Sequence, residues 1–273
     1  MIEISTLTAM KREGRKIVAA VVYDYQMAQI VDRAGVDIVS VGDSVGKNVW
    51  GQASELDVTL DQMLLACTAV RRGVARALVS CDLPYGPVQQ GNDAAVAAAR
   101  RLVKEGGADM VKVDAAAEFP DAVRAIVEAG IPVWAQFGVT PHTSGGSAFG
   151  GTRPTFASRP GAAEGGPGGT NTVDEFVAQA KLLESAGAAM LDFTHSGPVA
   201  GPAVTAAVSI PVIGGLGGGP WLDGRVRLAQ TVLGYGEKWV GSKTDTYFNT
   251  AQGTIDAFKA LVADARAGKQ IKG

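Results

Sequence analysis

Short apolar runs typical of buried strands alternate with amphipathic helical stretches from one end of this chain to the other. The helical stretches repeatedly stop at a glycine just before the next run, as at Gly35, Gly107, Gly130 and Gly187. Strands and helices that alternate in this way form parallel sheets. The expected strands span residues 16–22, 38–41, 77–81, 110–113, 132–137, 189–193, 211–213 and, with the weakest pattern, 238–240.

Two of the helical stretches carry a clear start signal. Thr59 with Gln62, and Thr172 with Glu175, have the spacing of a capping box. Eight strands that are each followed by a helix match a (β/α)8 TIM barrel, whereas nothing marks the strand-order reversal of a doubly wound open sheet. We therefore expect an α/β fold with a single (β/α)8 barrel domain over residues 1–273. The expected helices span residues 26–34, 60–72, 94–105, 122–129, 175–186 and 225–233.

A long glycine-rich loop, from Ser144 to Thr172, follows the fifth expected strand and has no apolar periodicity. Barrel enzymes hold their catalytic groups on this side of the fold. Loops of this length are usually functional lids or disordered insertions. We favour a mobile lid over an inert insertion, with Phe149, Arg153 and Arg159 meeting an anionic substrate when it closes.

The composition excludes several classes of partner. The net charge is −2 and no basic stripe is interleaved with aromatic residues, so we expect no nucleic-acid or anionic-membrane partner. No apolar run approaches the length of a membrane span, and the first residues do not form a signal peptide. Cys67 and Cys81 lie in apolar stretches and are expected to be buried free thiols. These features predict a cytoplasmic protein.

Four of the expected strands end at or beside an aspartate: Asp24, Asp43, Asp82 and Asp114. The carboxyl ends of parallel strands meet at one end of a barrel, so these carboxylates are expected to lie together. Carboxylates at such short range repel each other by several kcal/mol unless a cation lies between them. The pattern therefore predicts a divalent-metal active site.

Lys112 and Asp114 are two residues apart and share one face of their strand, inside the barrel mouth. A buried ion pair that only fills the barrel is the alternative explanation. Carboxylates without histidine or thiolate ligands suit Mg²⁺ first and Mn²⁺ second. Such an ion chelates a small-molecule 2-oxo acid and stabilises its enolate. Lys112 would offset charge on the bound oxygens, and Ser44 would donate a hydrogen bond to the substrate carboxylate.

Two further features are less specific. The glycine run at residues 213–219 follows the seventh expected strand, where barrels bind phosphate or give a substrate close access to the backbone. His142 and His195 are the only histidines, too few for a zinc site. A lone loop histidine is usually a surface residue, but His195 directly follows the sixth expected strand and carries more weight.

The chain resembles the ketopantoate hydroxymethyltransferase family, within the phosphoenolpyruvate mutase and isocitrate lyase superfamily. The matching stretches lie in family order over most of the chain. They are residues 23–25 (YDY), 41–46 (VGDSVG), 58–63 (VTLDQM), 69–73 (AVRRG), 82–86 (DLPYG), 111–114 (VKVD), 138–141 (GVTP) and 210–214 (IPVIG).

The resemblance implies roles for several residues. Asp43, Asp82 and Asp114 match the positions that surround magnesium, although the third is usually glutamate in the family. Ser44 and Lys112 match the positions that hold the carboxylate and keto oxygen of the 2-oxo acid. The implied reaction adds a hydroxymethyl group from methylene-tetrahydrofolate to 3-methyl-2-oxobutanoate, which opens pantothenate synthesis. Family members assemble into rings, so a homo-oligomer is implied, with the helix at residues 254–265 as a packing element.

The chain departs from the family pattern at the positions that the family uses for proton transfer. It has Ala135 and Gln136 in place of a glycine–histidine pair, and Thr194 in place of the glutamate that takes a proton from C3 of the substrate. Gln136 and Thr194 would then contact the substrate, but a threonine hydroxyl is not a base unaided. We expect Asp192 or His195 to replace the glutamate, with Asp192 slightly favoured.

The changed residues leave three functions open. The first is the family's magnesium-dependent hydroxymethyl transfer, or a closely related aldol-type reaction. The second is C–C bond cleavage or transfer by the same superfamily, acting on another 2-oxo or dicarboxylic acid. The third is a catalytically weak barrel that binds 2-oxo acids. Asp43, Asp82, Lys112 and Asp114 together favour an enzyme, because a degenerate site need not keep its metal ligands.

Overall fold

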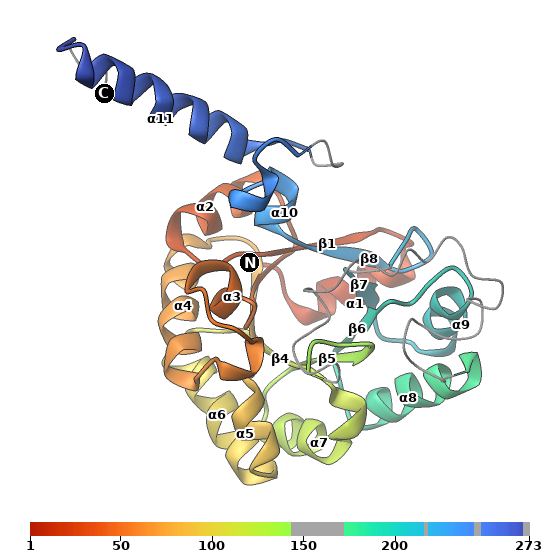
Figure 1. Cartoon of the computed structure of the whole chain (residues 1–273). Helices are drawn as coiled ribbons and strands as arrows, with labels where there is room; N and C mark the ends of the chain where they lie inside the picture. The colour runs from red at the N-terminus through yellow and green to blue at the C-terminus, as the bar shows by residue number, and fades with distance from the viewer. Residues whose placement is uncertain (143–171, 216–217, 243–246, 270–273) are drawn as a thin grey trace. The chain divides into compact units, whose positions relative to one another are not determined.

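The computed structural model describes residues 1–142, 172–215, 218–242 and 247–269 (Figure 1). Its eight strands form one closed parallel barrel in chain order, which confirms the expected (β/α)8 architecture. Figure 1 shows helices around the outside of the strands. The strands are β1 (Ile17–Val21), β2 (Ile38–Val41), β3 (Leu78–Asp82), β4 (Met110–Val113), β5 (Val133–Gly138), β6 (Met190–Thr194), β7 (Val212–Gly214) and β8 (Gly224–Leu228).

Helices follow the strands as the periodicity predicts, together with short helices that the pattern did not reveal. Both capping boxes are present, at Thr59 with Gln62 and at Thr172 with Glu175. The α-helices are α1 (Ile4–Arg12), α2 (Tyr25–Ala34), α3 (Val45–Val49), α4 (Leu60–Gly73), α5 (Tyr85–Gln89), α6 (Asn92–Lys104), α7 (Pro120–Glu128), α8 (Val173–Ser185), α9 (Ala200–Ala207), α10 (Ala229–Leu233) and α11 (Thr250–Arg266).

The eighth strand lies elsewhere than predicted. Residues 238–240, expected as a strand, fall largely within the short 3-10 helix η3 (Glu237–Trp239), and β8 lies inside the stretch 225–233 that was expected to be helical. In β8 the arginines Arg225 and Arg227 alternate with Val226 and Leu228, a period of two that fits a strand. The apolar residues that follow continue as α10, and the helical pattern of the whole stretch concealed the strand.

The side chains inside the barrel form layers, because every second residue of a strand faces inward. The layer at the amino ends is apolar and fully buried, and Leu7 and Met10 of α1 pack against it. One step toward the carboxyl ends, the inward residues become polar, as at Ser40, Lys112 and Asp192. The apolar layer includes Ile38, Leu78, Met110, Trp134 and Met190. The barrel therefore has an apolar end, against which α1 packs, and a polar end.

One smaller expectation is also confirmed. Cys67 and Cys81 are free and buried. Asp24 caps α2, its side chain accepting a hydrogen bond from the Met27 amide at 2.8 Å, so its carboxylate is engaged at the start of this helix.

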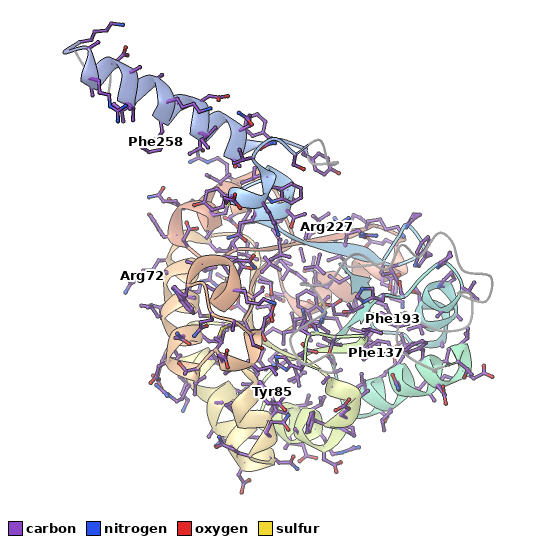
Figure 2. All side chains as sticks on the ribbon, viewed as in Figure 1. Arg72, Tyr85, Phe137, Phe193, Arg227 and Phe258 are labelled. Carbon is purple, nitrogen blue, oxygen red and sulfur yellow. The ribbon has the colours of Figure 1, made fainter. Side chains whose placement is uncertain are left out.

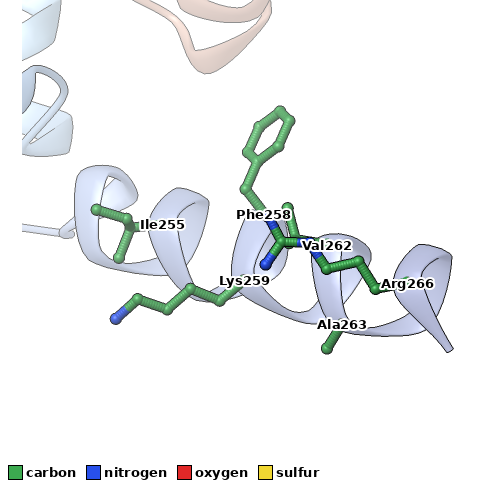
Figure 3. Close-up of a pocket in the computed structure, with 6 residues that line it drawn as sticks. All are labelled: Ile255, Phe258, Lys259, Val262, Ala263 and Arg266. Atoms are coloured by element: carbon green, nitrogen blue, oxygen red, sulfur yellow. The ribbon is translucent and has the colours of Figure 1, made fainter.

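The chain divides into two compact units, Met1–Val226 and Arg227–Gly273. The expectation of one domain over the whole chain stays a prediction. In the second unit, α11 contains the helix expected at residues 254–265. Figure 2 labels Phe258 on this helix, and Figure 3 shows it in a hollow that is also lined by Ile255, Lys259, Val262, Ala263 and Arg266. Among the described residues, no helix is long and apolar enough to cross a membrane.

Candidate active site

Asp43, Asp82 and Asp114 come together at the carboxyl ends of their strands, as the sequence predicts. The Asp43 amide lies 3.4 Å from Oδ2 of Asp82 and donates to it. Burial raises the pKa of Asp82 to about 7; the charge of Lys112 opposes this shift, while Asp43 and Asp114 add to it. Burial also raises the pKa of Asp114, again with a contribution from Asp43. Asp43 and Asp114 therefore disfavour ionisation of Asp82, and Asp43 disfavours ionisation of Asp114.

His142 lies among these carboxylates, which the sequence did not reveal. Its Nε2 is 2.7 Å from Oδ2 of Asp43 and 3.9 Å from Oδ2 of Asp114, and its side chain is only 4% exposed. The expectation of a surface histidine is wrong. Burial alone would lower the pKa of His142, but Asp43 and Asp114 outweigh it and raise the pKa to about 9. The signal in the sequence was its place just after Thr140 and Pro141, beside the end of β5.

The donor atoms fit a hard divalent cation. Oδ1 of Asp82 is buried and has no hydrogen-bond partner among the described residues, an arrangement that is costly without a cation. Three carboxylates supply the oxygen ligands that Mg²⁺ prefers. As placed, no three His, Cys, Asp or Glu side chains of the described residues form a group tight enough to hold a metal ion. His142 and Lys112 provide the positive charge among the carboxylates in this arrangement.

Lys112 forms a buried ion pair with Asp192, 2.8 Å from Nζ to Oδ2, with side chains 8% and 3% exposed. Its Nζ also lies 4.8 Å from the centroid of the Trp134 ring, which forms the layer below. Burial alone would lower the pKa of Lys112, but Asp192 and Asp82 raise it above its usual value. Lys112 is therefore a fixed cation beside the three carboxylates.

Gln136 and Thr194 contact each other directly. Nε2 of Gln136 donates to Oγ1 of Thr194 at 3.0 Å, and both side chains are buried. The register of β5 and β6 brings them together, because Gln136 pairs with Asp192 and Gly138 with Thr194. An amide and a hydroxyl that bind each other form an uncharged pair, so these positions place no ionisable group at the barrel mouth.

His195 lies just beyond Thr194 and is partly buried. Its Nδ1 donates to the Val139 carbonyl at 3.1 Å. Burial lowers the pKa of His195, and the hydrogen bond to Val139 opposes the shift. Its φ of 60° lies in the left-handed region, which non-glycine residues rarely adopt outside functional or strained positions.

Ser44 lies next to Asp43, at the start of α3. Its Oγ is 2.8 Å from the Tyr23 hydroxyl, which also accepts from Nδ2 of Asn48 at 3.2 Å. Burial raises the pKa of Tyr23, so its hydroxyl stays protonated. The contacts fix the orientation of Ser44 beside the carboxylates.

The structure thus brings most of the predicted site residues to one end of the barrel. The expected lid at residues 144–172 lies almost wholly outside the described residues, as do two positions of the glycine run at 213–219. The roles assigned to the individual residues stay predictions.

Solved structures define the fold class. A 2,3-dimethylmalate lyase, described as a member of the PEP mutase/isocitrate lyase superfamily, matches with a TM-score of 0.61 at 13% identity, covering 98% of this chain and 88% of that one. Phosphonopyruvate hydrolase, solved in complex with oxalate and Mg²⁺, matches with a TM-score of 0.60 at 14% identity, covering 98% and 89%. The barrel is therefore of the kind found in this superfamily.

Sequence comparison shows the family. The model of the ketopantoate hydroxymethyltransferase family matches residues 1–270. A 3-methyl-2-oxobutanoate hydroxymethyltransferase of Moorella thermoacetica is 36% identical over 268 residues, 98% of this chain and 94% of its own. A Salinibacter ruber protein of the same name is 36% identical over 261 residues, 96% and 93%. The chain belongs to the ketopantoate hydroxymethyltransferase family and is a hydroxymethyltransferase-like enzyme.

Proposed function

We propose that the protein transfers a hydroxymethyl group from methylene-tetrahydrofolate to 3-methyl-2-oxobutanoate, with Mg²⁺ as its metal and Mn²⁺ as a substitute. The observation that carries the proposal is the cluster of Asp43, Asp82 and Asp114 beside Lys112, in which one oxygen of Asp82 has no hydrogen-bond partner in the described part of the chain. The full-length similarity to enzymes of that name supports the same reaction. Pantothenate synthesis is the pathway that this activity would serve.

The chain's own residues have separate tasks in this proposal. Asp43, Asp82 and Asp114 would hold the metal, which as a Lewis acid polarises the keto group of the 2-oxo acid. Lys112, held in place by Asp192, offsets negative charge on the keto oxygen. Ser44, oriented by Tyr23, donates to the substrate carboxylate. Gln136 and Thr194 form an uncharged wall near the substrate.

The proposed transfer proceeds through an enolate of the 2-oxo acid. The C3–H bond breaks, and its electron pair forms the C2=C3 double bond of an enolate, while the proton goes to a base. C3 then forms a bond to the one-carbon unit, water supplies the hydroxyl oxygen, and tetrahydrofolate leaves. The cationic environment of Lys112 favours the enolate over the neutral ketone, which lowers the barrier to loss of the proton.

A second function is favoured by one observation. The hydrogen-bonded pair Gln136–Thr194 carries no base, so this barrel face suits a reaction that starts from an alkoxide and needs no loss of a C–H proton. That reaction would be C–C cleavage or transfer on a different 2-oxo or dicarboxylic acid.

Deuterium exchange at C3 of 3-methyl-2-oxobutanoate separates the two functions. The acid is incubated with the protein in D₂O without folate, and loss of the C3 proton signal is followed by NMR. We expect exchange with Mg²⁺ and none after chelation of the metal with EDTA. Metal-dependent binding of the acid without exchange would favour the second function. Absence of both binding and exchange would contradict the proposed hydroxymethyl transfer and favour a catalytically weak barrel.

We further propose that the protein is a homo-oligomer that associates through α11. Ile255, Phe258 and Val262 lie on one face of this helix and are 37%, 60% and 43% exposed. Replacing Phe258 and Val262 by aspartate should lower the mass in solution, measured by light scattering after gel filtration, whereas Asp256→Asn on the same helix should not. An unchanged mass in the double variant would contradict this interface.

A cytoplasmic location belongs to the same proposal. Free, buried Cys67 and Cys81 agree with a reducing compartment, where structural disulfides are rare.

A further inference from the structure

Trp134 lies inside the barrel, directly against the lysine of the site. It pairs in register with Lys112 across β4 and β5, and its side chain is fully buried. Nζ of Lys112 lies over the indole ring, 4.8 Å from its centroid. The same ring belongs to the apolar layer that contains Met110 and Met190. Trp134 therefore lies at the boundary between the apolar layer and the charged groups of the site.

The ammonium of Lys112 needs compensation for its burial. Its side chain is only 8% exposed, so it has lost most of its water, and a buried charge is costly without partners. Asp192 supplies one partner, 2.8 Å from Nζ. The face of an indole ring is negative and attracts a cation within about 6 Å, most strongly when both are shielded from water. The ring of Trp134 therefore compensates the ammonium from a second side.

Packing alone does not account for a tryptophan at this position. Nε1 of Trp134 is buried and has no hydrogen-bond partner among the described residues, whereas a buried tryptophan N–H usually has one. Phenylalanine or leucine would fill apolar space without burying this donor. Indole binds cations better than the other aromatic rings do, and this attraction offsets the cost of the donor. The contact with Lys112 thus explains the residue type.

The two contacts restrict where the ammonium can lie. Lysine has a flexible stem, and its ammonium has no fixed direction of its own. Here Trp134 on β5 and Asp192 on β6 hold the ammonium of Lys112, which is on β4. A cation that is held in advance does not have to reorganise when negative charge develops beside it, and this lowers the barrier.

We propose that Trp134 is a positioning residue for Lys112, and that the negative face of its ring holds the ammonium where the keto oxygen of the 2-oxo acid gains charge. The inference rests on the proposed function and adds a residue to it. Trp134 acts through Lys112 and makes no contact with the substrate. Its effect should fall on the rate of enolate formation more than on affinity, because the oxygen carries more charge in the transition state than in the bound ketone.

Fluorination of the ring tests the proposal, because fluorine weakens the negative face and barely changes the size of the ring. Trp134 is replaced site-specifically by tryptophan with one, two or three ring fluorines. Exchange at C3 of 3-methyl-2-oxobutanoate in D₂O is then measured at saturating acid and Mg²⁺. We expect the rate to fall with each fluorine, by about tenfold or more at three, while the affinity for the acid by calorimetry changes less than about threefold. An unchanged rate across the series would overturn the proposal, because a ring that only fills space is insensitive to its charge distribution.

Trp239 provides the matched control. Lys238 lies over its ring, 5.6 Å from the centroid, and neither residue is part of the site described above. The same fluorinated series at Trp239 should leave the rate of exchange unchanged, and an equal fall there would overturn the proposal.

Natural substitutions give a second measure. Trp134→Phe, which keeps an aromatic face, should retain faster exchange than Trp134→Met, which keeps only apolar bulk. Equal rates in these two variants would contradict the role of the ring face while leaving the proposed function intact. Absence of exchange in the wild type would instead contradict the proposed function, and the inference would fall with it.

Discussion

Replacing Asp82 by asparagine should abolish magnesium-dependent exchange at C3, with a loss of more than about 10³-fold, because Lewis-acid stabilisation is worth several kcal/mol. Asp82 interacts with both Asp43 and Lys112 and carries a buried carboxylate oxygen that has no hydrogen-bond partner among the described residues. Asparagine keeps the shape of the side chain but loses the charge that holds the cation. The variant should also lose the rise in melting temperature that Mg²⁺ gives to the wild type by binding the folded state.

The stability of the metal-free protein provides an independent readout. Burial and the neighbouring carboxylates disfavour the charged form of Asp82 in the folded state, so this carboxylate opposes folding at pH values above its unfolded-state pKa. Without metal at pH 8, Asp82→Asn should therefore unfold at a higher temperature than the wild type. Asp24→Ser, which keeps the α2 cap, should change neither the exchange at C3 nor the melting temperature. Full activity in Asp82→Asn would contradict its assignment as a metal ligand.

Replacing Lys112 by methionine should lower the free energy of unfolding by about 3–5 kcal/mol, because it leaves Asp192 buried without its partner. The expected measurement is urea denaturation followed by circular dichroism. Exchange at C3 should be lost as well, since the cation beside the keto oxygen is gone.

A second substitution separates the two effects. In the double variant Lys112→Met with Asp192→Leu, apolar side chains of similar size replace the ion pair, and such exchanges are often neutral for stability. We expect its free energy of unfolding to return to within about 1 kcal/mol of the wild type while exchange stays absent. Arg101→Met, which removes exposed pairs with Asp61 and Glu105, is the control and should leave the urea midpoint almost unchanged, because exposed ion pairs contribute little to stability. A stable, active Lys112→Met variant would contradict both the role of Lys112 in neutralising buried Asp192 and its role beside the keto oxygen.

The sequence predicts the barrel well because its strands are buried on both sides and end at recognisable residues. Seven strands lie where the apolar runs are, and Asp43, Asp82 and Asp114 meet as expected. β8 was missed because its five residues, Gly224–Leu228, are part of a stretch whose apolar spacing also suits a helix. Local periodicity does not distinguish a strand from a helix in this stretch, because closure of the barrel determines which of the two forms.

Contacts between distant residues were harder to predict. His142 follows a strand end, but its insertion among the carboxylates depends on the path of the loop after β5. Gln136 and Thr194 were each recognised as departures from the family, yet their hydrogen bond depends on the register between β5 and β6, 58 residues apart in the chain. The ion pair of Lys112 with Asp192 also joins two strands that are distant in the chain, β4 and β6.

The hydrogen bond between Gln136 and Thr194 also limits how the site can evolve. Each side chain satisfies a buried polar atom of the other. Replacing only one of them by an apolar residue would therefore lower the free energy of unfolding by about 1–3 kcal/mol until the other position also changed. Substitutions at the two positions are therefore expected to occur together during evolution. Reconstructed ancestors of this chain should carry matched residues at 136 and 194.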